Sequence, residues 1–299
     1  MVRALTLGLS LLVLLAAPAR AEEEKKAPKP IPPLASAEEV AEALAEFKIA
    51  YKAKGMKGEE KLAEQDFAMR NLAQVQHPKI VDALAKLTKN RSPEISTSAV
   101  IQLGSQRRTP GYAGQAVVAA MKRKSKDDTF QMAGLAAIAN LGYLGAKDTI
   151  VGLMGHHDYA VRKNALVTIG KLKDERFIEE IVKLMKALRL EKGAKWDGVE
   201  VNYDTGTAGD GDQKMAEKIG KAKQAKNAKK GKRAGRSQRD IGPVVLELMF
   251  TLTGEQFTGG IAARKWLGEN RAKVDGQVAE RVKQAKAQAA EAKASKKLR

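Results

Sequence analysis

The chain has 299 residues, and its 54 Lys and Arg outnumber its 35 Asp and Glu, which gives a formal net charge of +19 at pH 7. It contains no cysteine, which excludes disulfides, thiolate metal sites and a lipid-modified N-terminal cysteine. Aromatic residues make up only 4% of the chain, while helix-forming alanine, leucine, lysine and glutamate are abundant, so the composition favours an all-α fold.

Residues 1–21 have the pattern of a signal peptide. Arg3 precedes an apolar run from Leu5 to Ala17, and Ala19-Arg20-Ala21 forms an A-x-A cleavage site before Glu22. The run is too short for a bilayer core of about 30 Å, which takes roughly 20 apolar residues to cross. We therefore expect an exported protein of the periplasm or cell envelope, or a secreted one, without a transmembrane segment after cleavage. A retained N-terminal anchor is the alternative.

Residues 22–35 are charged and rich in proline, as is typical of an extended linker. Ser36, with Glu39 three residues later, forms a capping-box pattern, which predicts that the first helix begins there. The apolar residues of that helix recur at helical spacing: Val40, Leu44, Phe47 and Tyr51. Glycines at 55 and 58 predict its end, and a second helix is expected over about 59–76.

A short apolar block then returns along the chain. Its copies begin at Ile80, Val117, Ile150 and Ile181, which are 37, 33 and 31 residues apart. This spacing fits a pair of helices with two turns, and a lone pair buries too little apolar surface to be stable. The sequence therefore predicts an α-solenoid of stacked helical hairpins over 36–192. Gly104 and Gly142 follow the last apolar residue of a helix, which predicts helix ends with positive φ at both positions.

One copy carries a family resemblance. The stretch Asp158 to Leu166 (DYAVRKNAL) and the stretch Ile169 to Phe177 (IGKLKDERF) follow the pattern D-x-x-V-R-x-x-A-L-x-x-L-G with an acidic turn. This pattern resembles a HEAT repeat of the short bacterial, phycobilisome-lyase-like type. Leu252 to Asn270 is similar to an end unit of exported bacterial HEAT proteins, which makes 241–271 a terminal helical hairpin. The resemblance covers about residues 64–191 and 241–271, and it implies an interaction scaffold rather than an enzyme.

The helical pattern stops between residues 193 and 240. Lys195 to Tyr203 alternates apolar and polar residues, as a short strand does, and an insertion between stacked units often projects from the binding face. We expect Trp196 and Tyr203 to anchor a partner there. The three carboxylates that follow fit either a solvated turn or a calcium site, although their spacing is not that of an EF-hand. They are Asp204, Asp210 and Asp212.

Lys214 to Arg239 holds eleven basic residues and a single acid, Glu217. Such a segment is either a solvated arm that maintains solubility or a contact for a polyanion. A signal peptide and the absence of aromatic residues from the arm argue against nucleic acid, so an acidic protein, glycan or lipid head group is the expected partner. The candidate contacts are Lys226, Lys229, Lys230, Lys232 and Arg233. A second basic stretch, 272–299, is rich in alanine and lysine and is expected to be a frayed helical tail.

Few residues of the chain have the pattern of a catalytic or metal site. His77 precedes a proline at a helix turn, and His156 and His157 lie before Asp158 between two repeats. Adjacent imidazoles on a loop need a third ligand from elsewhere to hold a metal, so we interpret all three histidines as turn residues. No nucleophile, phosphate-loop or dinucleotide motif is present. We therefore predict no catalytic residue, no metal and no cofactor.

The sequence thus predicts a non-enzymatic exported scaffold that binds another protein or an acidic envelope component. An accessory subunit of an envelope enzyme or assembly is the main alternative. A metal-dependent enzyme that uses His156, His157 and Asp158 is a further alternative, and so is a nucleic-acid-binding protein, which requires an uncleaved N-terminus. The sequence predicts neither the oligomeric state nor the face of the solenoid that binds.

Overall fold

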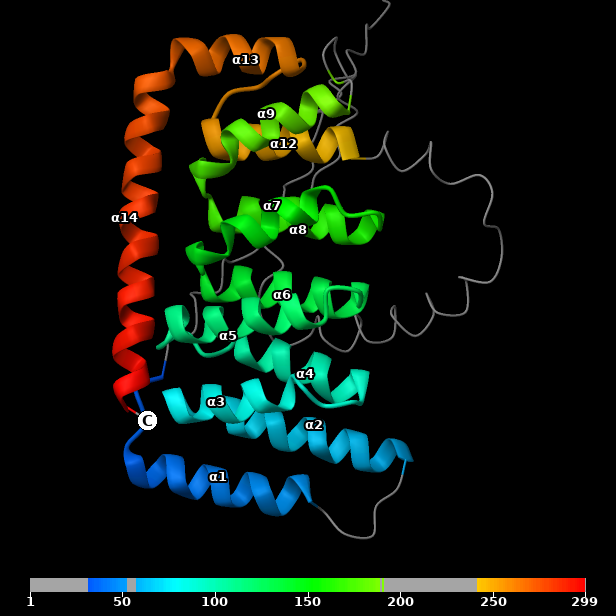
Figure 1. Ribbon diagram of the computed structural model, residues 1–299, viewed down its shortest axis with the longest axis vertical. Coiled ribbons are helices and arrows are strands. Elements are labelled where there is room, and N and C mark those ends of the chain that lie inside the picture. Colours follow the sequence, from blue (N-terminus) through cyan, green and yellow to red (C-terminus); the bar gives the residue numbers. More distant parts are fainter. Residues whose placement is uncertain (1–31, 53–57, 189, 191–240, 299) are drawn as a thin grey trace, which may run out of the picture. The chain divides into compact units, whose positions relative to one another are not determined.

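A computed structural model describes residues 32–52, 58–188, 190 and 241–298, and within these ranges the chain is all-α, as predicted (Figure 1). The elements are α1 (Ala37–Tyr51), α2 (Gly58–Gln74), α3 (Pro78–Leu87), α4 (Pro93–Leu103), α5 (Pro110–Arg123), α6 (Asp128–Leu141), η1 (Leu144–Ala146), α7 (Lys147–Met154), α8 (Tyr159–Leu172), η2 (Glu175–Phe177), α9 (Ile178–Ala187), α12 (Ile241–Thr253), α13 (Gly260–Glu269), α14 (Arg271–Ser295) and η3 (Lys296–Leu298). Among these helices, none combines the length and the apolarity that a membrane crossing requires. The expected signal peptide and strand lie outside the described residues.

The helix boundaries follow from local chemistry. The predicted capping box is confirmed, because the Ser36 N–H donates to Glu39 Oε2 at 2.7 Å and the Glu39 N–H donates to Ser36 Oγ at 3.2 Å. The hydrogen bond from the Ser36 N–H to the Glu39 carboxylate, and to a smaller extent a hydrogen bond from the Ser36 side chain, lower the pKa of Glu39. Helix α1 ends at Tyr51 and α2 begins at Gly58, where φ is +60°. The glycine-rich segment between 51 and 58 therefore separates two helices, as expected.

The two helix-ending glycines have different roles. Gly142 adopts the left-handed conformation with φ of 61°, as predicted for a glycine that ends a helix. The same prediction is wrong for Gly104, which keeps a right-handed φ of −64°. A Cβ atom on Gly104 would lie 2.8 Å from the Cα atom of Ala137 in α6. Glycine is therefore needed at 104 for the close approach of α4 and α6 rather than for the turn.

The helices lie in two rows. In the first row, α2, α4, α6, α8 and α12 each contact the next helix. In the second row, α3 and α5 contact each other, and this row packs on the first through α3 on α4, α5 on α6, α7 on α8 and α9 on α12. The core lies between the rows, and the first residue of every recurring apolar block is 0% exposed. These residues are Ile80, Val117, Ile150 and Ile181.

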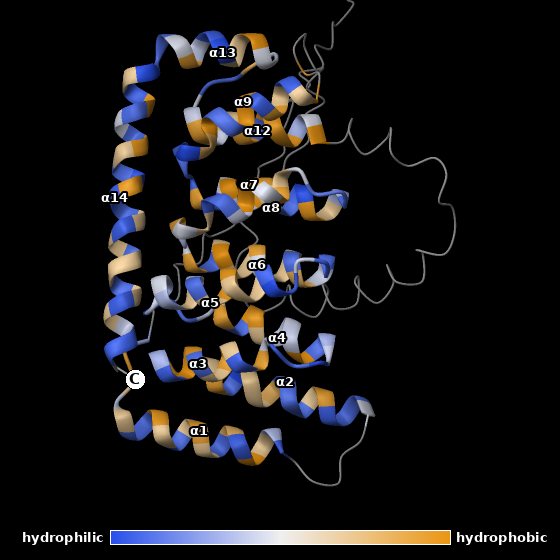
Figure 2. Ribbon diagram, in the orientation of Figure 1, coloured by the Kyte–Doolittle hydropathy of each residue, from blue (hydrophilic) through white to orange (hydrophobic). Residues whose placement is uncertain are grey.

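Helix α14 runs along the ends of the other helices instead of joining a row (Figure 1, red). It contacts α13, η2, η1 and α5, and Figure 2 shows that it is far less hydrophobic than α6, α7 or α12. Val274, Ala292 and Ser295 are nevertheless buried. The expectation of a frayed tail over 272–299 therefore differs from the structure, in which most of this segment is one packed helix.

Polar contacts hold α14 to successive turns between the helices. Arg281 Nε donates to Glu175 Oε2 at 2.7 Å, and its Nη2 donates to the Lys173 carbonyl oxygen at 2.6 Å. Gln288 donates to the Gly142 carbonyl oxygen and accepts from the Leu144 N–H, both at 2.9 Å. The Gly111 N–H donates to Glu291 Oε2 at 3.3 Å. One helix thus contacts three turns in order along the stack.

Candidate functional site

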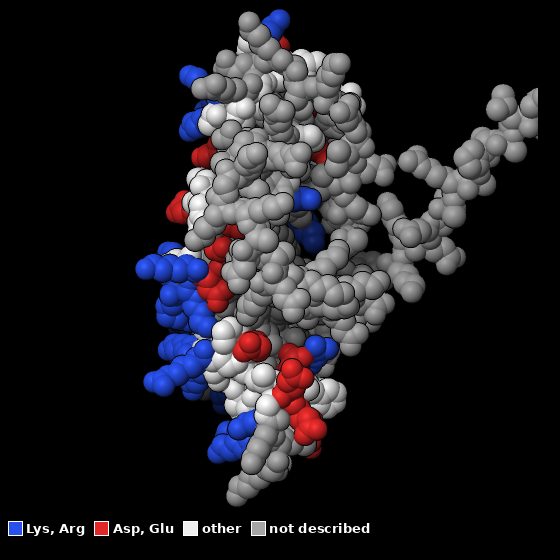
Figure 3. Space-filling model, turned by 90° about the vertical axis from the view of Figure 1, so that its right-hand side faces the viewer, with Lys and Arg blue, Asp and Glu red and all other residues white. Residues whose placement is uncertain are grey.

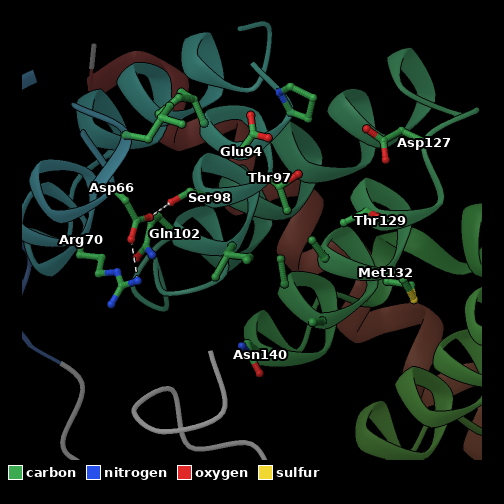
Figure 4. Close-up of a pocket in the computed structure, with 17 residues that line it drawn as sticks. Asp66, Arg70, Glu94, Thr97, Ser98, Gln102, Asp127, Thr129, Met132 and Asn140 are labelled. Carbon is green, nitrogen blue, oxygen red and sulfur yellow. Dashed lines mark hydrogen bonds and ion pairs between the residues drawn. The ribbon is translucent and has the colours of Figure 1, made fainter. Parts of the chain in front are cut away.

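A groove of about 580 Å³ lies over three neighbouring helices of the first row, α2, α4 and α6 (Figure 4). A volume of roughly 300–1,000 Å³ is usual for a ligand pocket. Small side chains on α6 leave this space open, namely Ala133, Ala136 and Ala137. The larger apolar side chains of the lining pack partly against the core, and they are Leu62, Ile101 and Met132. The floor of the groove is therefore apolar and preformed.

The charged residues of the lining are mostly acidic. Asp66 accepts a hydrogen bond from Ser98 and forms an ion pair with Arg70 at 2.5 Å, one helical turn away. Glu94 accepts from Ser92 Oγ at 2.8 Å, and Asp127 caps α6 by accepting from the Phe130 N–H at 3.1 Å. Among the described residues, the lining thus holds three carboxylates and one basic side chain, that of Arg70.

Four polar side chains of the lining have no hydrogen-bond partner among the described residues. They are Thr97, Gln102, Thr129 and Asn140. Gln102 and Asn140 each lie two residues before the glycine that ends their helix, so they occupy equivalent positions in α4 and α6. Each carboxamide can both donate and accept a hydrogen bond. The groove therefore presents free polar groups next to an apolar floor.

The charge of the two rows differs around the groove. Helices α2, α4 and α6 carry six acidic and two basic residues, whereas α3 and α5 of the other row carry one acidic and four basic residues. In Figure 3, Lys and Arg side chains project mainly along the left border, and most Asp and Glu side chains lie nearer the centre. A chain with a net charge of +19 thus has a groove of the opposite sign. The net charge of the sequence conceals this separation.

The structure also supplies the third potential metal ligand that the sequence lacked. Asp128 from α6 lies beside the two adjacent histidines, and its carboxylate oxygens are 3.9 Å from His156 Nε2 and 4.0 Å from His157 Nε2. However, His156 Nδ1 accepts a hydrogen bond from the Asp158 N–H at 3.2 Å. A neutral imidazole that accepts at Nδ1 carries its proton on Nε2, which then has no lone pair for a metal. The donor set therefore does not fit a metal in this arrangement.

The other predicted turn residues have structural contacts. Asp158 caps α8, because its Oδ1 accepts from the Ala160 N–H at 2.8 Å and the Val161 N–H at 3.1 Å. His77 caps α3, because its Nδ1 accepts from the Lys79 N–H at 3.1 Å. Burial, and to a smaller extent the charge of Lys79, lower the pKa of His77. Both residues thus act at helix starts, and for His77 this agrees with its interpretation as a turn residue.

The partner-binding residues predicted in the insertion lie outside the described residues, and the groove does not include them. They are Trp196, Tyr203, Lys226, Lys229, Lys230, Lys232 and Arg233. The same holds for the calcium alternative at Asp204, Asp210 and Asp212. Comparison of the sequence with known protein families and with curated proteins finds no match in either. The role of the insertion and the HEAT-like resemblance therefore stay predictions.

Proposed function

We propose that the protein is an exported, non-enzymatic interaction scaffold, an α-solenoid of HEAT-like hairpins that binds another protein. The observation that carries this proposal is the groove on α2, α4 and α6, which combines an apolar floor with polar groups that have no hydrogen-bond partner in the described part of the chain. The two rows of helices support the solenoid part, since each helix of the first row contacts the next as stacked repeats do. The apolar run and A-x-A site within 1–21 support export.

A preformed groove suits this role. Its walls are helices whose buried faces form the core, so a partner can bind without rearrangement of the stack. The basic segment 214–239 adds a second contact for acidic partners, with affinity that falls as salt screens the charges. A scaffold of this kind can act alone or as the accessory subunit of an envelope enzyme or assembly.

Export is tested by N-terminal sequencing of the protein from its own cells, together with cell fractionation. We expect a mature chain that begins at Glu22 and appears in the periplasmic or envelope fraction. A chain that retains Met1 and stays in the cytoplasm would contradict the export part of the proposal and would favour the nucleic-acid-binding alternative.

Partner binding is tested in the same cells by photo-crosslinking. A photoreactive amino acid is introduced at Ala136 in the groove and, as matched control, at the exposed Ala119 on α5 in the other row. We expect a discrete crosslinked protein from position 136 and none from position 119. The same experiment with the protein lacking 193–240, at rising salt, measures what the insertion adds. If no described surface position yields a crosslinked protein, the scaffold function is wrong.

A further inference from the structure

We propose that the groove on α2, α4 and α6 binds an extended segment of a partner protein in which apolar and basic side chains alternate. This inference rests on the proposed scaffold function and names the chemistry of its partner. Three independent features of the groove carry it: the charge of the lining, its apolar floor and the hydrogen-bonding groups that have no partner.

The charge of the lining selects a basic partner. Among the described residues, the lining has one basic side chain, Arg70, which is paired with Asp66, and its other two carboxylates are those of Glu94 and Asp127. Both lie where α4 and α6 begin, so the negative charge gathers at one edge of the groove (Figure 4). Lysine and arginine side chains reach such an edge while their methylene stems stay on apolar surface. An acidic partner would be repelled from the same edge.

The floor selects apolar side chains. Leu62, Ile101 and Met132 come from three successive helices, and the small residues of α6 leave room above them. A segment that crosses the three helices can therefore place one apolar side chain over each. Burial of each such side chain on the apolar floor favours binding.

The partner-free polar groups select an extended backbone. Gln102 and Asn140 lie in the last turns of α4 and α6, at the edge opposite Glu94 and Asp127. A helical segment satisfies its own backbone N–H and C=O groups, whereas an extended segment leaves them free to pair with these carboxamides. Successive side chains of an extended chain point in opposite directions, so the apolar residues of an alternating segment can all face the floor. The basic side chains then start on the other side of the segment, and their long stems bend along the edge toward Glu94 and Asp127.

The test uses fluorescence anisotropy with three labelled eight-residue peptides. The first alternates leucine and lysine, the second has the same composition in a helical 3.6-residue pattern, and the third alternates leucine and glutamate. We expect the first to bind at least about fivefold more tightly than either of the others, since the second lacks the backbone pairing and the third lacks the charge complementarity. Equal binding of the first and second peptides would overturn the extended conformation, and preferred binding of the third would overturn the choice of charge.

Variants locate the site. Ala136→Trp fills the groove, and we expect it to weaken binding of the leucine–lysine peptide at least about tenfold, whereas Ala119→Trp on the other row changes it less than about twofold. The double variant Gln102→Leu/Asn140→Leu keeps the size of the side chains and removes their donors and acceptors. This double variant is expected to weaken binding of the leucine–lysine peptide about three- to thirtyfold. Thermal melting of each variant confirms that it is folded. Unchanged binding by Ala136→Trp would overturn the assignment of the groove.

Two further results bear on the occupant. The groove is occupied by the basic segment 214–239 of the same chain if peptide binding appears only after residues 193–240 are deleted, and this outcome would overturn a separate partner. Failure of the groove assignment can be distinguished from failure of the proposed scaffold function. Crosslinked protein from positions outside the groove, together with no peptide binding, would overturn only the groove assignment. The absence of any crosslinked protein would overturn the scaffold function itself.

Discussion

Gly111→Ala is a direct test of how α14 is held against the helix ends. Gly111 lies in the first turn of α5, and a Cβ atom there would lie 2.1 Å from the carbonyl oxygen of Gln288 and 2.9 Å from its carbonyl carbon. These are backbone atoms of α14, so they cannot rotate away as the end of a side chain can. An ordinary contact is about 3.4 Å or longer, so α14 must move by more than about an ångström at this point.

The movement removes several identified contacts. The hydrogen bond from the Gly111 N–H to Glu291 is already 3.3 Å long, and the two bonds of Gln288, to Gly142 and Leu144, lie on the same stretch of α14. At about 0.5–1.5 kcal/mol each, their loss lowers the free energy of unfolding by roughly 2–4 kcal/mol. Typical domains are stable by about 5–15 kcal/mol, so this loss is measurable and leaves the rows of helices folded.

Hydrogen exchange measured by mass spectrometry distinguishes a local release from general unfolding. We expect the amides of residues 281–295 to lose protection in Gly111→Ala while those of α6 keep it, together with a lower midpoint of urea unfolding. The matched control is Gly276→Ala on α14, where a Cβ atom meets nothing within 4 Å. It is expected to stabilise the protein by roughly 0.5–1 kcal/mol through helix propensity. If Gly111→Ala keeps both the protection of α14 and the stability of the unsubstituted protein, the packing of α14 on α5 is wrong.

Three other results follow from single contacts. Burial raises the pKa of Glu291, while the hydrogen bond from Gly111 opposes this rise. The folded protein therefore binds the proton of Glu291 more tightly than the unfolded chain does. The stability that protonated Glu291 contributes is fully present below the pKa of the unfolded state and is lost as the pH rises through the pKa of the folded state. Glu291→Gln should accordingly melt higher than the unsubstituted protein at pH 7, and the difference should shrink toward pH 4; a constant difference would contradict this reasoning. His77 has a lowered pKa, so the stability that depends on its neutral, capping form is present above about pH 6.5 and is lost as pH falls. His77→Asn keeps a capping side chain, so it should match the unsubstituted protein within about 1 kcal/mol at pH 7.5 and exceed its melting temperature at pH 5. A zinc titration monitored by calorimetry should show no stoichiometric site, because His156 Nδ1 accepts a backbone hydrogen bond. A zinc site that is lost in His156→Ala but kept in His77→Ala would refute the conclusion that these side chains do not bind a metal.

Features that depend on neighbouring residues could be predicted from the sequence. The capping box at Ser36 and Glu39 involves residues three apart, and the structure confirms it. The recurring blocks at Ile80 and Ile181 are buried as their apolar character indicates. Gly104 shows where such reasoning stops, because its position after an apolar residue indicates a helix end, whereas its packing on Ala137 depends on a helix that follows 24 residues later.

The groove and α14 could not be predicted, because their residues come from distant parts of the chain. The groove arises where small residues of α6 face the side chains of α2 and α4, and no pattern within one helix indicates it. Helix α14 has few large apolar residues and is held by polar contacts to backbone groups of turns. Asp128 likewise reaches the two histidines from a helix that begins 28 residues before His156.

The position of α14 also determines when during synthesis the protein can complete its fold. Arg281 contacts Glu175, 106 residues earlier, and Glu291 contacts Gly111, 180 residues earlier. The contacts between neighbouring helices of the two rows join residues that are closer in the sequence, and such contacts form faster during folding. The hydrogen bond between Gly111 and Glu291 can form only after α14 has been translated. The rows of helices must therefore persist without these contacts until α14 has been translated, and cleavage of the chain just before α14 would return them to that state.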